Sequence, residues 1–263
     1  SGLLDKVLLR LSENLEKQQK LNATVKGALV YPVIVIFLMV VVVGIMMVFA
    51  IPQLSEFYKS MGVKLPLSTQ LIVTMSNLMI NFWWLFVIGF LTVVYTFRKL
   101  YAKETGRRSV DLFILKVPLV GKLVSESLMV EFSRTLGLLI GTGSLVVDSL
   151  LKSADVVDNL IYRREIILVA KRVEKGISIG DALETSSIFP PILVQMVKIG
   201  EQTGKLDESL TRVGEYFERE VEQTMKALTT AIEPLLMVIL GLGVGFLIFA
   251  VITPIYKVIS SIQ

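Results

Sequence analysis

The sequence predicts an all-α polytopic membrane protein, with three transmembrane helices and a cytoplasmic antiparallel bundle of about six helices. Three windows of 19 or more residues contain no charged side chain. Between the second and third windows, apolar residues recur with helical spacing, and no run alternates for long with the period of two that a strand would show. Of the 263 residues, 53% are hydrophobic and only 19% are charged, below the roughly 25% of ordinary globular chains.

The composition also excludes several classes of function. The chain has no Cys and no His, so disulfides, thiolate or imidazole metal sites, cysteine nucleophiles and histidine bases are all ruled out. Together with the motifs and the family resemblance described below, this leads us to predict no catalytic residues, no metal ligands and no cofactor.

The uncharged windows are residues 33–51, 71–97 and 235–256. A helix rises about 1.5 Å per residue, so roughly 20 residues cross the hydrocarbon layer of a bilayer. A buried core helix is the alternative, but core helices seldom stay apolar on every face over such a length. Trp83 and Trp84 lie in the middle of the second window, where interfacial aromatics are not expected, so the boundaries of that span are open.

The basic residues predict the orientation. Residues 1–31, an amphipathic helix, carry five Lys or Arg, and residues 98–230 carry nineteen, so 24 of the 27 lie on one side if all three windows span. The positive-inside rule places that side in the cytoplasm and the C-terminus outside. The expected organisation begins with a cytoplasmic helix over residues 1–31, followed by two spans over residues 32–97 with a short outer loop at 53–70. A cytoplasmic helical domain over residues 98–230 comes next, and residues 231–263 form a third span with an outer C-terminus.

An internal repeat joins the two ends of the chain. A shift of 202 residues aligns residues 1–61 with 203–263 without a gap. The apolar stripe of the first copy meets an apolar stripe in the second, and the prolines that bracket the span coincide; the pairs are Leu4/Leu206, Leu8/Leu210, Leu11/Val213, Leu15/Phe217, Pro32/Pro234 and Pro52/Pro254. A soluble segment precedes the second copy, so we expect the chain to be a fragment that lacks a first cytoplasmic domain.

The segment 98–203 is predicted to be helical throughout. Helix-breaking signals divide it at Val117-Pro118, Thr142-Gly143, Gly176 and Phe189-Pro190-Pro191, with Ser144 expected as an N-cap. Residues 98–230 contain nineteen basic and eighteen acidic side chains. This near balance argues against a nucleic-acid surface, which requires a field of one sign.

Glycine motifs offer no nucleotide site. The sequence Gly141-Thr-Gly-Ser144 lacks the lysine of a phosphate loop and is expected to be a turn, so a partner must supply any energy from ATP. Gly241 and Gly245 lie inside the third window with small-xxx-small spacing. They either allow close packing of another helix, within the chain or in a dimer, or are incidental.

The entrance to the third span carries a carboxylate. Glu233 precedes Pro234, whereas Tyr31 precedes Pro32 at the equivalent place in the first copy. Glu233 is either solvated at the membrane interface or paired with a cation on a neighbouring helix or a transiting partner.

Gly200, Glu201 and Gly204 mark a second candidate site before the long helical segment that begins at Leu206. The glycines suit a tight helix-turn-helix corner. The corner is either purely structural or transmits movement of the bundle into the following helix. Acidic residues on that helix (Glu215, Glu218, Glu220 and Glu222) are expected to form a solvated face with i,i+4 pairs, and a docking surface is the alternative.

Several motifs of this sequence resemble the PilC/GspF family, the inner-membrane platform proteins of type IV pili and type II secretion systems. Ile199-Gly200-Glu201-Gln202-Thr203-Gly204-Lys205-Leu206 is similar to its Gly-Glu-x-Ser/Thr-Gly-x-Leu motif. Its pattern is also matched by Phe132 to Leu136 with the Gly-Thr-Gly turn, by Gly180-Asp181-Ala182-Leu183 with Phe189-Pro190-Pro191, and by Tyr31-Pro32 and Glu233-Pro234. The second repeat unit is matched across its length. Of the first, only Ser1 to Leu4 and the span remain, without the preceding Gly-Glu.

The resemblance implies a type II secretion F domain in a non-enzymatic adaptor of the bacterial inner membrane. It further implies contacts with a hexameric cytoplasmic assembly ATPase, pilin or pseudopilin subunits and other inner-membrane alignment proteins, as well as homo-oligomers. A small-molecule transporter subunit or another membrane scaffold is the alternative. Three spans without ionisable groups at mid-membrane argue against transport and intramembrane catalysis.

Overall fold

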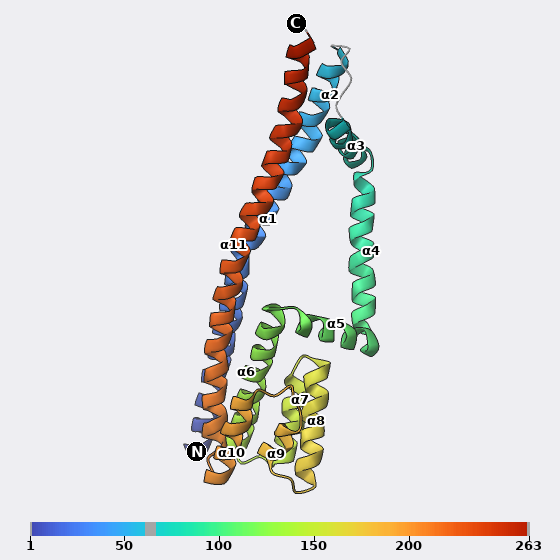
Figure 1. Ribbon diagram of the computed structural model, residues 1–263. Helices are drawn as coiled ribbons and strands as arrows, with labels where there is room; N and C mark the ends of the chain where they lie inside the picture. Colours follow the sequence, from blue (N-terminus) through green and yellow to red (C-terminus); the bar gives the residue numbers. More distant parts are fainter. Residues whose placement is uncertain (1, 61–66, 262–263) are drawn as a thin grey trace. The chain divides into compact units, whose positions relative to one another are not determined.

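The computed structural model describes residues 2–60 and 67–261, and every regular element in these ranges is a helix (Figure 1). The all-α prediction is confirmed. The chain divides into two compact units, the first made of Ser1–Ala28 and Leu100–Leu228 and the second of Leu29–Lys99 and Thr229–Gln263. The elements in chain order are α1 (Gly2–Ile45), a π-helical segment η1 (Met46–Ala50), α2 (Ile51–Ser60), α3 (Leu67–Asn81), α4 (Trp83–Ala102), α5 (Glu104–Lys116), α6 (Val120–Gly141), α7 (Val146–Val156), α8 (Leu160–Glu174), α9 (Ile179–Glu184), α10 (Pro191–Thr203) and α11 (Leu206–Ser261).

Three helical stretches are long and apolar enough to cross a membrane, as the sequence predicts: Ala23–Phe57, Trp83–Ala102 and Leu206–Gly245. The second differs in extent from the predicted window 71–97, because the helix breaks at Phe82. Asn81, a weak helix former, ends α3, and α4 begins at Trp83. The tryptophans in the middle of the window thus mark the start of a helix. The predicted outer loop 53–70 is helical up to Ser60, and residues 61–66 lie outside the described part.

The π-helical segment of the second unit has a cause in the sequence. The N–H of Ile51 donates to the carbonyl of Met46, five residues back. In this register the next donor, to the carbonyl of Met47, would be residue 52, but Pro52 has no N–H. The hydroxyl of Ser76 in α3 donates to the Met47 carbonyl instead. Beside this contact, Ile51 and Ile72 are buried against each other.

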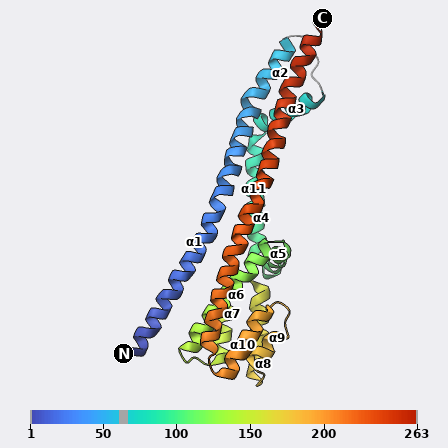
Figure 2. The ribbon, with the colours of Figure 1, turned by 60° about the vertical axis from the view of Figure 1, so that its left-hand side comes forward.

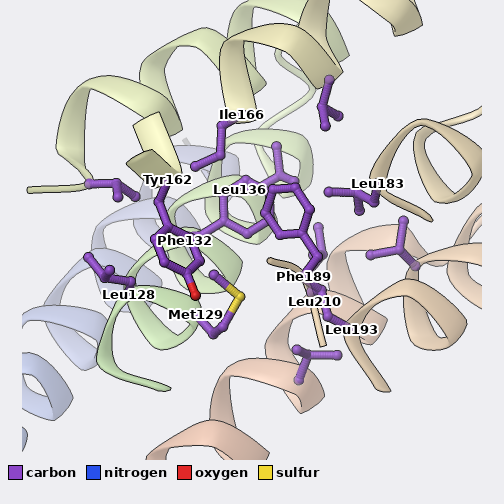
Figure 3. Packing of buried hydrophobic residues seen from close by; sticks show 14 of the residues in the cluster. Leu128, Met129, Phe132, Leu136, Tyr162, Ile166, Leu183, Phe189, Leu193 and Leu210 are labelled. Carbon is purple, nitrogen blue, oxygen red and sulfur yellow. The ribbon is translucent and has the colours of Figure 1, made fainter. Parts of the chain in front are cut away.

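The first unit is a helical bundle around one hydrophobic core (Figure 3). Helices α6 and α10 lie beside the first part of α11 in both views, α7 packs against α6, α8 against α7, and α9 against α8 and α10 (Figure 1 and Figure 2). Fully buried side chains come from all six of these helices: Phe132 and Leu136 of α6, Leu150 of α7, Ile166 of α8, Leu183 of α9, Leu193 of α10 and Leu210 of α11. The apolar stripe predicted in the second repeat, Leu206, Leu210, Val213 and Phe217, is buried in this core. The side chains of its counterparts in the first copy lie outside the described ones.

Polar contacts fix the junctions between helices. Asn159 is the N-cap of α8, and its side-chain oxygen accepts from the backbone N–H groups of Ile161 and Tyr162. The buried Asp111 of α5 accepts from the N–H of Leu160, 2.9 Å away. The expectation for Ser144 is wrong, because α7 starts at Val146 and its N-cap residue is Leu145.

Candidate functional site

The predicted corner before the long helix lies between α10 and α11. Helix α10 ends at Thr203, and Gly204 adopts the left-handed conformation with φ +69°. The N–H of Lys205 donates to the carbonyl of Gly200 over 2.9 Å, so the last turn of α10 is closed by the usual left-handed cap. A residue with a Cβ would be strained at Gly204.

Gly200 allows the two helices to approach closely at this corner. A Cβ atom at Gly200 would lie 2.8 Å from the Cβ of Ser209 and 3.0 Å from the Cα of Leu206. Such distances are too short for carbon atoms, so the start of α11 would have to move. The sequence pattern predicts the corner. In the structure, Gly204 is needed for the left-handed backbone conformation and Gly200 for the close approach of α11.

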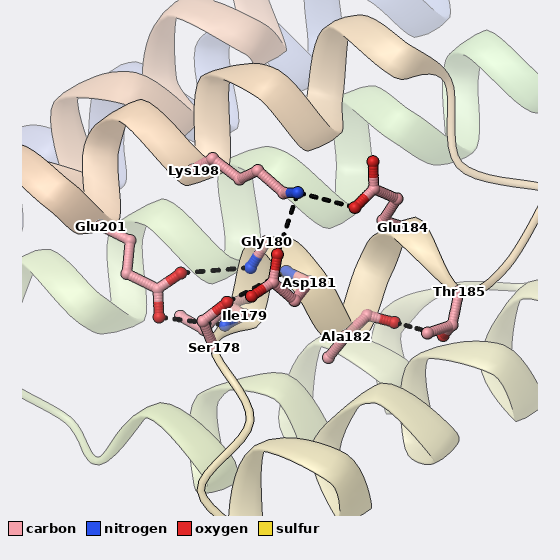
Figure 4. A network of polar contacts seen from close by, with 9 residues as sticks. All are labelled: Ser178, Ile179, Gly180, Asp181, Ala182, Glu184, Thr185, Lys198 and Glu201. Atoms are coloured by element: carbon pink, nitrogen blue, oxygen red, sulfur yellow. Dashed lines mark hydrogen bonds and ion pairs between the residues drawn. The ribbon is translucent and has the colours of Figure 1, made fainter.

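Glu201 holds the N-terminus of α9 with both carboxylate oxygens (Figure 4). Oε1 accepts from the N–H of Ile179 at 3.0 Å, and Oε2 accepts from the N–H of Gly180 at 3.2 Å. The Ser178 hydroxyl accepts from the N–H of Asp181 at 3.1 Å. Three backbone donors that a helix start leaves without partners are thereby satisfied, and the negative charge lies at the positive end of the helix.

A lysine completes the link between α9 and α10. The ammonium group of Lys198 lies 2.9 Å from a carboxylate oxygen of Asp181 and 2.7 Å from one of Glu184. Its hydrogen bonds to Glu184 and Asp181 raise the pKa of Lys198, and the same contact with Lys198 lowers the pKa of Asp181. Gly180 lets the helices meet, since a Cβ there would lie 3.2 Å from the Cα of Lys198.

We call the cluster of Glu201, Lys198, Gly200, Gly204 and the start of α9 the corner cluster. It connects α9, α10 and the start of α11 to one another. Contacts of this kind can transmit movement from one helix to the next. Sequence reasoning placed Glu201 in the corner but missed its partners on α9. The sequence signal for these partners is the motif Gly180-Asp181 at the start of α9. Among the residues that the structure describes, no group of acidic side chains could hold a metal ion.

The acidic residues of α11 are paired across helices, so the predicted i,i+4 pairing is wrong for the residues seen in ion pairs. Glu218 pairs with Arg134 of α6, and Glu215 pairs with Lys17 of α1 at 3.1 Å. Glu220 lies 3.7 Å from Lys122 of α6. One turn further, the Thr224 hydroxyl donates to the buried carboxylate of Glu126 at 2.8 Å. Contacts with other helices therefore fix this face of α11.

The candidates at the entrances to the first and third spans lie in the second unit. Pro32 lies inside α1 and is buried, whereas Tyr31 is exposed. Glu233 and Pro234 are exposed on α11. No ion pair joins Glu233 to a cation in the described part of the chain, and its pairing with a transiting partner stays a prediction.

The glycines of the third span are open. A Cβ atom at Gly241 or Gly245 would meet no described atom within 4 Å. The described residues therefore provide no helix packed against this face, and packing against a second copy stays a prediction.

Comparison with known proteins gives a family match. The model of a family described as "Type II secretion system (T2SS), protein F" matches residues 1–52 and 132–254. These ranges contain most of both repeat copies, the α6 motif and the corner cluster.

Curated relatives cover almost the whole chain. It is 34% identical to the type IV pilus assembly protein TapC of Aeromonas hydrophila over 98% of its length and 32% identical to the type IV pilus assembly protein PilC of Pseudomonas aeruginosa over 98%. It is 28% identical to the type II secretion system protein F of Vibrio cholerae, again over 98%. The chain spans 62%, 69% and 63% of these relatives' own lengths, respectively.

Proposed function

Because the chain belongs to the family of type II secretion system protein F, we propose that it is part of a non-enzymatic membrane platform for type IV pilus assembly or type II secretion. The family resemblance expected from the sequence is confirmed by the family match and the relatives. The platform couples a cytoplasmic assembly ATPase to the insertion or extraction of pilin or pseudopilin subunits. It acts in the bacterial inner membrane as a homo-oligomer beside other alignment proteins.

The proposed topology follows the distribution of basic residues. Residues 1–31 and 98–230 lie in the cytoplasm, residues 32–97 contain the first two spans with an outer loop, and residues 231–263 contain the third span and a periplasmic C-terminus. The support comes from 24 basic residues on one side and from three helices able to cross a membrane.

The observation that carries the coupling proposal is the position of the corner cluster. Glu201 joins α9 to α10, and after Gly204 the chain enters α11, which continues to Ser261 and contains the third candidate span. A force on α9 or α10 is therefore passed to the base of α11 through a corner with little freedom. A partner that moves the bundle thereby has a mechanical path into a membrane helix.

Glu201→Gln in the full-length protein, expressed in its own cells, tests this proposal. The amide oxygen of Gln can accept a hydrogen bond, but it replaces a charged acceptor of two N–H groups by a neutral one. Glu174→Gln is the matched control, since Glu174 is an exposed carboxylate in the same unit. We expect fibre assembly or secretion to fall with Glu201→Gln at unchanged protein level, and to stay normal with Glu174→Gln.

Co-purification separates coupling from binding. The Glu201→Gln protein should still co-purify with the assembly ATPase and with pilin, because the proposed role of the corner is to transmit movement and not to bind either partner. Normal fibre assembly by this variant would contradict the coupling role. Failure of the unaltered full-length protein to bind either partner would contradict the platform role itself.

A further inference from the structure

Helix α5 presents an exposed face that none of the proposed roles uses. Leu112 and Phe113 are 40% and 70% exposed, and Arg108 and Lys116 are exposed beside them. Residues 108, 112 and 116 are spaced i, i+4, i+8, so a leucine lies between two cations along one row of the helix. Phe113 lies next to this row, three residues before Lys116.

The face of α5 that carries Asp111 and Leu115 is fixed to the bundle. Asp111 accepts the N–H of Leu160 at the start of α8, and Leu115 packs against the hydrophobic core. The Arg107 guanidinium pairs with Asp158 and lies over the ring of Tyr101, 5.4 Å from its centroid. The rotation of α5 about its axis is thus determined, and the face with Phe113 is held outward.

The chain places this helix directly after a membrane-spanning one. Helix α4 ends at Ala102 and α5 begins at Glu104, with only Lys103 between them. The N–H of Lys103 donates to the carbonyl of Leu100 over 3.2 Å, and Gly106 lies so close to the backbone of Leu100 that a Cβ there would collide with it. The first turn of α5 is therefore bound to the last turn of the span.

We propose that the face of α5 formed by Arg108, Leu112, Phe113 and Lys116 rests in the membrane interface and binds anionic lipid headgroups. An amphipathic helix with cations beside apolar side chains inserts its apolar groups roughly 5–10 Å into the boundary between headgroups and acyl chains. Arg98, Lys99 and Lys103 add positive charge at the same end of the span. This proposal rests on the membrane placement given under the proposed function.

The absence of cysteine from the chain allows a direct measurement of depth. Single-cysteine variants Phe113→Cys, Leu145→Cys and Phe90→Cys are labelled with an environment-sensitive fluorophore in the full chain. They are then reconstituted in vesicles of phosphatidylethanolamine and phosphatidylglycerol with nitroxide-labelled lipids. Leu145, 74% exposed in the same unit, is the matched control, and Phe90, 69% exposed in α4, reports on the span itself.

We expect nitroxides near the headgroups to quench the label at position 113 strongly, and to leave the label at 145 unquenched. Nitroxides deep in the acyl chains should quench the label at 90. Adding Arg108→Gln and Lys116→Gln to Phe113→Cys should weaken the quenching, and so should replacing phosphatidylglycerol with a neutral lipid.

Three results would overturn the proposal. If the label at 113 behaves like that at 145 while the label at 90 is quenched, α5 faces water although the span is inserted. If the label at 113 is shielded from aqueous iodide but not quenched by lipid nitroxides, a second copy covers the face. If the label at 90 is not quenched either, the proposed membrane placement is wrong, and so is the interfacial position of α5 that rests on it.

Discussion

The hydroxyl of Ser76 donates a hydrogen bond to the backbone carbonyl of Met47, 29 residues earlier in the chain. This carbonyl lacks a helical partner because Pro52 occupies the position whose N–H would reach it. Ser76 is fully buried, and its contact joins α3 to the π-helical segment of the first span. A proline in one helix thus sets the need for a serine in another.

Ser76→Ala should therefore destabilise the protein by about 1–3 kcal/mol, the usual effect of leaving a buried polar group unpaired. Pro52→Ala restores an N–H at position 52 that can bond to the same carbonyl. A double-mutant cycle of thermal unfolding in detergent should show that Ser76→Ala costs less when Pro52 is already replaced. Strictly additive effects would mean that the two residues act independently.

Gly200→Ala should destabilise the corner cluster by roughly 1–3 kcal/mol, because the added methyl overlaps Ser209 and the backbone of Leu206. The matched control is Gly27→Ala in α1, where a Cβ atom would have no neighbour within 4 Å among the described atoms. There we expect a gain of about 0.5–1 kcal/mol from the higher helix propensity of alanine. Thermal unfolding of both variants makes the comparison, and equal effects would refute the close approach at Gly200.

Glu131 is expected to make the stability of the bundle depend on pH. Burial, and to a lesser degree the nearby carboxylate of Asp158, raise the pKa of Glu131 above its ordinary value of 4.5. The folded state therefore holds this proton to a higher pH than the unfolded chain does. As pH rises from 4.5 through the raised pKa, ionisation of Glu131 in its half-buried site lowers the free energy of unfolding.

Glu131→Gln should accordingly unfold at a higher temperature than the unaltered chain at neutral pH. The difference should shrink as the solution is acidified through that same window. Glu174→Gln, which removes an exposed carboxylate from the same unit, is the control for the loss of one negative charge. A Glu131→Gln variant that is less stable at neutral pH would show that the carboxylate makes favourable contacts in its ionised form.

The pair of Arg134 and Glu218 joins α6 to α11, and only 11% and 17% of the two side chains are exposed. Arg134→Ala alone should cost roughly 1.5–3 kcal/mol, because it removes a hydrogen bond between charged groups and leaves Glu218 partly buried without its partner. The double variant Arg134→Met with Glu218→Leu should cost less than the sum of the two single changes. Chemical denaturation gives these values, and additivity would argue that the ion pair has no energetic role.

The proposed topology is tested by a label that cannot cross membranes. Ser60→Cys and Ser187→Cys each introduce the chain's only thiol at an exposed position. A membrane-impermeant maleimide applied to spheroplasts should react with position 60, in the proposed outer loop, and with position 187 only after the membrane is permeabilised. The reverse labelling pattern would contradict the orientation predicted from the basic residues.

Local patterns in the sequence predict much of this fold. The helix ends follow from residues such as Pro118 and Gly204, and the spans follow from the lack of charge. The corner between α10 and α11 is likewise visible in the spacing of Gly200 and Gly204. Each of these signals acts on its own neighbourhood in the chain.

The remaining features depend on partners that are distant in sequence. The acidic row of α11 suits i,i+4 pairs within the helix, but packing brings Arg134 and Lys17 closer to it. The Met47 carbonyl of the π-helical segment is satisfied by Ser76, and the role of Glu201 depends on a helix start 22 residues earlier. A pattern within one helix contains no information on which neighbour will satisfy its polar groups.

The contact of Glu201 with α9 also bears on the order in which the bundle folds. Helix α9 has six residues, too few for a helix to persist by itself in water. Two of its first N–H groups are satisfied by a carboxylate that reaches them only when α10 has formed and docked. We therefore expect residues 179–184 to become helical late and their amides to lose protection from hydrogen exchange first whenever α10 detaches. The start of α9 thus reports whether the bundle has finished assembling.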